Sequence, residues 1–310
     1  MTVLSTIQDR LALRFKNLLS GSTDGNPPWL EVVARGDEPG HFLPTDAPWV
    51  VHRDFGTLVG GVRALLVQAL HPGSLAGVMQ HSRYAAEPLG RLAGTIRWLT
   101  VTTFASLPEA LREGSRVVRL HNSVTGEYES PVKGRIAYRA DDSDLLEWVH
   151  IAFMESFLTA HEWYSHVPIP RGNRATGADN YIDQWGISVK ALGFEDVPHS
   201  RAEMDSRLSE IAATGVLTVT DDTRAVIAFI RNPPLPKAFK PVYRLLYEAA
   251  VASLRPEYRA LLGLRAWPRI VIVPVGRALL RLMRFAIGPK SPIEEAAIER
   301  LVRIGVLDGH

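Results

Sequence analysis

Apolar residues recur three and four positions apart over most of the chain, which is the spacing of amphipathic helices. The first clear stretch, residues 58–69, ends at His71-Pro72, where the proline prevents the helix from continuing. Prolines suited to the first helical position open two further predicted helices, over about 88–104 and 108–124. The pattern therefore predicts consecutive helices through the first half of the chain.

The second half of the chain continues this pattern. Ser143 or Asp144 is placed to cap a long predicted helix from Leu145 to about Tyr164. Further helices are predicted over residues 181–192, 200–213 and, interrupted by prolines, 239–307. Residues 133–139 predict a short strand or an extended connection, and strong strand pairs are absent. These patterns favour an all-α fold with few or no strands.

Glycine and proline set the beginning of the chain apart. They are frequent over residues 21–50, so we predict an N-terminal arm over residues 1–50. No convincing linker divides the remainder, and 310 residues can build one large core. We therefore predict a single large helical domain over residues 51–310.

Charge and cysteine content restrict the possible functions. The 35 basic and 33 acidic residues nearly balance, so no overall field points to nucleic acid. The chain has no cysteine, which excludes disulfide scaffolds, thiolate nucleophiles, iron–sulfur clusters and thiolate-ligated haem. Ten histidines remain as the main ligands for a metal ion.

The beginning of the chain has no apolar stretch of the signal-peptide type, and no run of about 18 apolar residues occurs. We expect a cytoplasmic protein. Residues 255–290 carry seven Arg and one Lys against one acid, with apolar residues between them. This segment predicts either peripheral contact with an anionic membrane or an amphipathic helix pair whose basic face lies in water.

Four residues of the predicted helix 88–104 form an unusual face. Arg91, Gly94, Thr95 and Trp98 lie at i, i+3, i+4 and i+7, so a cation, a gap, a hydroxyl and an indole share one side. Glycine within a helix costs about 1 kcal/mol relative to alanine. Close approach of another body, either a packed helix or a ligand, explains that glycine.

Histidines supply further candidates. His71 closes an apolar helix, where it either bonds the last carbonyls or stands as a buried polar group beside a pocket with His81. His121 follows apolar positions of the predicted helix 108–124 and is either a hydrogen-bonded core residue or a ligand. Nearby Arg116 and Arg119 suit the carboxylates of a cofactor.

Glu147 and His150 stand at i and i+3 on the predicted long helix, as in half of a di-iron carboxylate site. The second half of such a site is missing, although Glu155 is a further acid on the same helix. A non-haem iron oxygenase using Glu147 and His150 is therefore one alternative. A non-enzymatic helical protein that binds a ligand, with histidines as ordinary core groups, is another.

The order of these motifs resembles the MpaB/latex-clearing-protein family, the rubber-oxygenase catalytic domain, over roughly residues 45–270. The residues that carry the resemblance are Arg63–Pro72, Ala76–Val78, His81-Ser82, Gly90–Leu92, Thr95, Phe104, His121, Val124, Gly126, Tyr138, Ala140, Asp142, Trp148–His150 and Ser156–Leu158. The later stretches Leu192–Pro198, Leu217–Thr220 and Pro233–Pro236 also fit.

The resemblance implies an all-helical haem b protein with globin-like helix packing around the haem pocket. It implies oxygenase or peroxygenase chemistry on an apolar small molecule, with dioxygen or peroxide. His121 matches the proximal iron ligand, and His150 is our second choice. Arg91 and Thr95 match distal polar residues, while Gly94 stands where the rubber-cleaving branch has a lysine, which implies an open or water-ligated sixth position. His71, His81 and Trp98 are expected to line the pocket, with Arg116 and Arg119 binding the cofactor.

Overall fold

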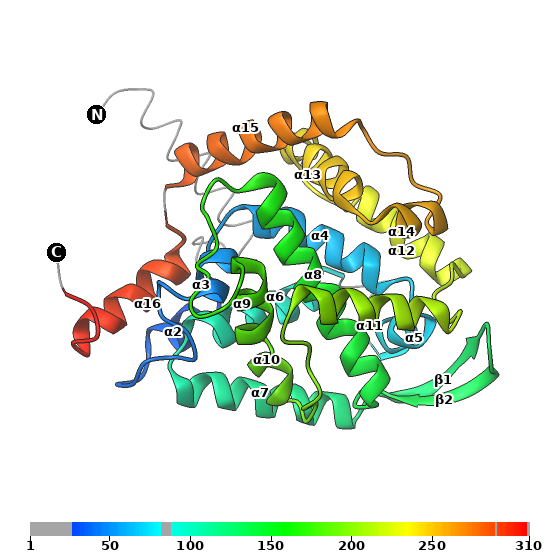
Figure 1. The fold of residues 1–310 in the computed structure, drawn as a ribbon, viewed down its shortest axis with the longest axis horizontal. Coiled ribbons are helices and arrows are strands. Elements are labelled where there is room, and N and C mark those ends of the chain that lie inside the picture. The colour runs from blue at the N-terminus through cyan, green and yellow to red at the C-terminus, as the bar shows by residue number, and fades with distance from the viewer. Residues whose placement is uncertain (1–26, 82–87, 289, 309–310) are drawn as a thin grey trace.

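Helices dominate the structure, a computed structural model that describes residues 27–81, 88–288 and 290–308 (Figure 1). For residues 88–92 and 286–287 it describes the backbone alone. Within these ranges the only sheet is one hairpin of two strands. The prediction of an all-α fold is confirmed.

A long central helix, α8 (Ser143–Tyr164), forms the axis of the core, with most of its side chains buried. Helix α4 (Gly56–Gln68) packs against it more extensively than any other described pair of helices. The close approach depends on Gly60, because a Cβ there would lie 2.7 Å from the ring of Phe157. The predicted helices over 58–69 and 145–164 therefore form the central pair of the fold.

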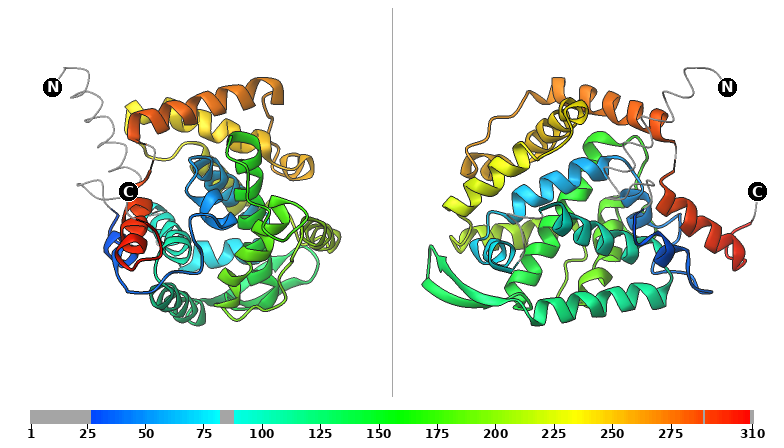
Figure 2. Two further views of the ribbon diagram at one scale, coloured as in Figure 1. Left: turned by 60° about the vertical axis from the view of Figure 1, so that its left-hand side comes forward. Right: turned by 180° about the vertical axis from the view of Figure 1, so that it is seen from behind.

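The remaining helices surround this pair. Helix α13 covers α4, and α15 lies outside α13 along one edge of the molecule (Figures 1 and 2). Helices α6 and α7 pack against each other, and α7 runs along the lower side of the molecule in Figure 1. The bounds are α5 (Pro72–His81), α6 (Pro88–Phe104), α7 (Leu107–Asn122), α11 (Arg201–Ala213), α12 (Asp221–Arg231), η1 (Lys237–Phe239), α13 (Lys240–Ser253), α14 (Pro256–Leu261), α15 (Arg269–Ile287) and α16 (Pro292–Arg303).

A β-hairpin projects from the helical body between α7 and α8 (Figures 1 and 2). Strand β1 (Thr125–Ser130) pairs antiparallel with β2 (Gly134–Arg139), with Tyr128 opposite Ile136. The sequence predicted only an extended segment over 133–139 and missed its partner. Charged residues alternate along β1, and the hairpin is anchored mainly by Tyr138, which packs on α5, so the strand pair carries little hydrophobic signal.

Residues 27–50 pack into the body of the protein, which differs from the predicted arm. They include α2 (Leu30–Ala34) and the start of α3 (Ala47–His52), and they bury Trp29, Val33 and Trp49. Glycine and proline break this segment into short pieces, while its few large apolar residues still reach the core. Residues 1–26 lie outside the described residues.

Two predicted helices differ in detail. The helix expected over 181–192 is two helices, α9 (Gly177–Trp185) and α10 (Ile187–Lys190), which meet at Gly186, where a Cβ would lie 2.9 Å from the Val197 side chain. Conversely, α15 continues through Pro274. Across the described ranges, no helix is long and apolar enough to span a bilayer.

Candidate functional site

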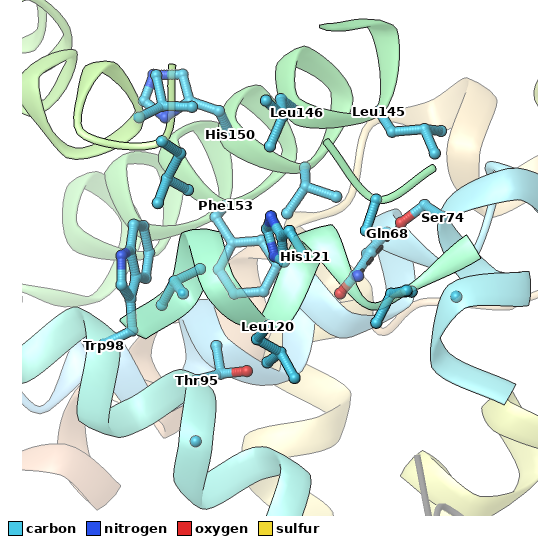
Figure 3. A pocket seen from close by; sticks show the side chains of 18 of the residues that line it. Gln68, Ser74, Thr95, Trp98, Leu120, His121, Leu145, Leu146, His150 and Phe153 are labelled. Carbon is cyan, nitrogen blue, oxygen red and sulfur yellow. Dashed lines mark hydrogen bonds between the residues drawn. The ribbon is translucent and has the colours of Figure 1, made fainter. Parts of the chain in front are cut away.

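A cavity of about 480 Å³ lies between α5, α6, α7 and α8 (Figure 3). Its volume falls within the roughly 300–1,000 Å³ of ligand-binding pockets. Aliphatic and aromatic side chains form most of its wall: Val117, Leu120, Val124, Leu145, Leu146, Val149, Phe153, Val189 and Leu192. Such a wall suits an apolar ligand or cofactor, and the few polar groups in it determine what chemistry it supports.

His150 on α8 is a deeply buried polar group of this wall. Neither of its ring nitrogens has a hydrogen-bond partner, a situation not found for any other buried histidine among the described residues. Burial, assisted by the positive charge of Arg207, lowers the pKa of His150 to about 3. The imidazole is therefore neutral near pH 7 and keeps an unshared lone pair for a metal ion or ligand.

His121, near the end of α7, lines the same cavity and is half-buried (Figure 3). It lies close enough to Asp141, in the connection to α8, to act on it electrostatically. The pKa of Asp141 is lowered by its hydrogen bond with Arg139 and, to a smaller extent, by His121. Two imidazoles from adjacent helices thus border one cavity.

Three members of the face predicted on helix 88–104 line the cavity from α6: Gly94, Thr95 and Trp98. A Cβ at Gly94 would meet nothing within 4 Å, so helix packing does not account for this glycine. The missing side chain instead enlarges the cavity. The fourth member, Arg91, is described by its backbone only, so its side chain lies outside the described residues.

Arg116 also lines the cavity and is held by a carboxylate. Its Nε donates to Oε1 of Glu113 at 2.9 Å, and Arg97 donates to the other oxygen at 2.9 Å. Burial alone would raise the pKa of Glu113, but the two arginines lower it. Arg119 is exposed and is not part of the cavity wall, so only one of the two predicted arginines reaches the site.

The two histidines at the ends of α5, His71 just before it and His81 at its last position, differ from each other. His81 lies at the exposed margin of the cavity, where its Nε2–H donates to the Thr125 carbonyl at 2.6 Å. His71 is buried outside the wall, with its ring near Tyr128 and Trp148, and burial lowers its pKa to about 4. His71 is therefore a core residue beside the site rather than a lining residue.

The acids of the predicted non-haem iron site have other partners. Glu147 pairs with Arg207 at 2.8 Å, and Glu155 is bound by Arg63 and Arg255 inside the core. In the parts of the chain that the structure describes, no three metal-ligating side chains gather.

Three further polar residues of the wall were not predicted from the sequence: Gln68, Tyr138 and Ser74. Gln68, at the end of α4, donates to Ser74 Oγ at 3.2 Å, and Tyr138 on β2 donates to Gln80 at 3.1 Å. A glutamine within the apolar stretch before His71 was the available signal for the first. Nothing in the sequence placed the second, because it reaches the cavity through the unpredicted hairpin.

A model of the family described as "ER-bound oxygenase mpaB/B'/Rubber oxygenase, catalytic domain" matches residues 49–285. The chain belongs to this family. The resemblance stated from the motifs is thereby confirmed, and the matched range includes every residue of the cavity wall. The family is an oxygenase catalytic domain, which indicates an oxidoreductase enzyme. Comparisons with curated proteins and with solved structures find no match.

Proposed function

We propose that the cavity binds haem b and that the protein is a haem-dependent oxygenase or peroxygenase of an apolar small molecule. The observation that best supports this proposal is the pair of imidazoles, His121 and His150, in one largely apolar cavity. Neither ring nitrogen of His150 has a hydrogen-bond partner. The open space at Gly94 also fits a bulky planar group. The residues present are thus compatible with a histidine-ligated haem.

His121 is our choice for the iron ligand. A ligating imidazole usually gives its other N–H to a carboxylate or a carbonyl, which orients the ring. Asp141 is a carboxylate on which His121 acts. His150 remains the second choice, because it is neutral and unpartnered but has no acceptor to orient it.

Bound haem supplies the redox chemistry with dioxygen or peroxide. The chain's own residues then have three tasks. Leu146, Val149 and Phe153 hold an apolar substrate and exclude water. The Thr95 hydroxyl offers a hydrogen bond on the side of Gly94, and Arg91, whose side chain lies outside the described residues, stays a predicted distal residue. Arg116 is the lining cation that suits a cofactor carboxylate.

Titration of the purified protein with haemin, followed by the Soret band, tests this proposal. We expect a saturable band in the wild-type protein. His121→Ala should abolish or shift it, whereas His166→Ala, which alters an exposed histidine outside the cavity, should leave it unchanged. An unchanged band in His121→Ala and a lost band in His150→Ala would move the ligand to His150.

Absence of a Soret band in the wild type and in all three histidine variants would contradict haem binding. Metal analysis of the protein as purified then decides between the other two functions. Iron without porphyrin would favour the non-haem oxygenase that uses Glu147 and His150. A colourless, metal-free protein that binds apolar compounds would favour the ligand-binding protein.

A further inference from the structure

Oxidisable aromatic side chains lead from the cavity into the core. Trp98, in the cavity wall, contacts Trp185 edge to face, with ring centroids 5.8 Å apart. Trp185 and Tyr181 lie on α9 at i+4 and i, one turn apart, and both are fully buried. His52 contacts both, with ring centroids 4.4 Å from Trp185 and 5.6 Å from Tyr181. The cavity and Tyr181 are thus joined through aromatic contacts.

The hydrogen bonds around His52 determine where its protons lie. The Thr103 hydroxyl donates to the Leu99 carbonyl at 2.7 Å, so its oxygen accepts from Nδ1–H of His52 at 2.8 Å. A neutral imidazole with its proton on Nδ1 has a lone pair on Nε2. Tyr181 therefore donates its hydroxyl proton to Nε2, at 2.9 Å.

The two buried aromatic residues differ in what they can do with a proton. The indole N–H of Trp185 has no hydrogen-bond partner. Oxidised Trp185 would keep its proton and remain a strong oxidant, because a buried N–H without an acceptor cannot release it. Tyr181 has a base in place, so loss of an electron there is accompanied by transfer of its proton. The oxidised state therefore moves from tryptophan to tyrosine.

We propose that Trp98, Trp185 and Tyr181 form an electron relay that draws oxidising equivalents out of the cavity. The oxidant, haem oxidised by peroxide, gains one electron from Trp98, which is restored through Trp185 by Tyr181. Tyr181 loses one electron and its phenolic proton, and Nε2 of His52 takes that proton and becomes imidazolium. The relay rests on the proposed haem for its oxidant, while its geometry depends on the chain alone.

Such a relay matters when the oxidant forms without a substrate in the cavity. The oxidising equivalent then leaves the cavity wall and comes to rest on Tyr181, a hydrogen-bonded tyrosine in the core. Side chains of the cavity wall, such as Trp98 and Phe153, would thereby escape irreversible oxidation.

Rapid-freeze electron paramagnetic resonance of the haem-loaded protein after addition of hydrogen peroxide tests the relay. We expect a tyrosyl radical in the wild type, its loss in Tyr181→Phe with a tryptophan radical in its place, and loss of the protein radical in Trp98→Phe. Tyr247→Phe is the matched control, since Tyr247 is equally buried but makes no hydrogen bond with its hydroxyl. A tyrosyl signal unchanged by Tyr181→Phe would overturn the proposal.

A second experiment separates the relay from haem binding. Azide radicals from pulse radiolysis oxidise tryptophan in the protein without cofactor, in a background where Trp163 and Trp267, which are also accessible, are replaced by phenylalanine. The tryptophan radical should decay into a tyrosyl radical, and both Tyr181→Phe and His52→Phe should remove this conversion. Conversion without haem binding would retain the relay and reject the haem. Equal conversion in the variants would reject the relay.

An independent feature of the surface carries a second proposal. Helix α15 leaves one apolar row exposed, with Ile270 85%, Leu282 63% and Phe285 77% accessible, on the outer edge of the molecule (Figures 1 and 2). Ile272, Leu280 and Met283 form the buried side of the same helix. The helix has no acidic residue and carries Arg269, Arg277, Arg281 and Arg284. Arg269 lies over the Trp163 ring, Arg277 donates to the Trp163 carbonyl and Arg284 pairs with Asp54, while Arg281 is exposed beside the row.

We infer that this row of α15 binds the surface of an anionic lipid bilayer. Exposed large apolar side chains flanked by arginines are the arrangement with which interfacial helices insert among lipid headgroups. Basic residues near an anionic bilayer contribute about 1 kcal/mol each. An anionic bilayer complements both features of the row, and this proposal takes up the first of the two alternatives predicted for residues 255–290.

Vesicle co-sedimentation tests this inference. The protein should bind vesicles of phosphatidylglycerol and phosphatidylcholine, but not phosphatidylcholine alone. The double variant Leu282→Ser/Phe285→Ser should lose binding, while Leu261→Ser, at an exposed leucine of α14, should retain it. Equal sedimentation of the double variant would overturn the inference. So would a wild-type dimer in light scattering that the double variant converts to monomer.

Discussion

His52 and His150 are alike in burial and opposite in bonding. Burial lowers the pKa of each to about 3, so both are neutral imidazoles near pH 7. His52, in the core, uses both ring nitrogens, one with Thr103 and one with Tyr181. His150, in the cavity wall, uses neither. The pKa alone does not distinguish a structural histidine from a site histidine; the hydrogen bonds do.

The same contrast extends to the charged groups. Arg63 and Glu155 are buried in the core, and Arg63 has further bonds to Ser156 at 2.8 Å and to the Ser253 carbonyl at 3.1 Å. The buried ion pair of the core is thus completed by protein partners, as is His52, although the Trp185 indole and the Tyr247 hydroxyl are not. A cavity that holds a ligand leaves polar groups incomplete, because the ligand supplies the missing partner. Substitutions in the two regions should therefore have different effects on stability.

The largest effect is expected for Glu155→Ala. It leaves the guanidinium of Arg63 buried without its main partner, and breaking a buried ion pair in this way costs about 3–5 kcal/mol. Urea unfolding measures the change, with Glu195→Ala, at an exposed residue, as a control that should change within about 0.5 kcal/mol. A loss for Glu155→Ala no larger than in this control would show that core partners are not needed.

His52→Phe should have the next largest effect. The ring volume is roughly kept, but the Tyr181 hydroxyl loses its acceptor in a fully buried place. A buried hydroxyl without a partner costs about 1–3 kcal/mol. The double variant His52→Phe/Tyr181→Phe removes the orphaned hydroxyl and should recover part of the loss. A double variant less stable than His52→Phe would contradict this explanation.

The cost of His52→Phe should also shrink in acid. The pKa of His52 is about 3 when folded, owing mainly to burial and also to His161, and about 6.5 when unfolded. Below about pH 6.5 the unfolded chain therefore binds a proton that the folded protein does not. The free energy of unfolding of the wild type consequently decreases as the pH is lowered. The difference between the two proteins should narrow by about 2 kcal/mol between pH 7 and pH 5. A difference independent of pH would show that His52 titrates normally.

The secondary-structure elements could be predicted from the sequence better than the tertiary contacts between them. Helices α4, α6 and α8 follow from apolar spacing and from Pro88, because local pattern determines them. Only the second strand of the hairpin was predicted, because β1 is polar and its position depends on contacts with α5, which is distant in the sequence. The packing of residues 27–50 depends likewise on contacts that Trp29 and Val33 make with later elements.

The site shows the same division. The face of Gly94, Thr95 and Trp98 was recognised from spacing, and the structure places it in the cavity wall. Arg116 and Arg119 looked equivalent, yet they differ by three positions on α7, and only the orientation of that helix puts one in the wall. The unpartnered nitrogens of His150 were not predictable, because they depend on every element packed around it.

The smallest effect is expected for His150→Leu, and it tests the comparison most directly. The imidazole is desolvated without gaining a hydrogen bond, so replacing it by an apolar side chain removes a penalty and breaks nothing. The stability of the cofactor-free protein should change by less than about 1 kcal/mol or rise. Urea unfolding beside His52→Phe measures this at the same pH. A loss as large as that of His52→Phe would mean that His150 is bound by protein groups after all, and that the core and the cavity wall do not differ.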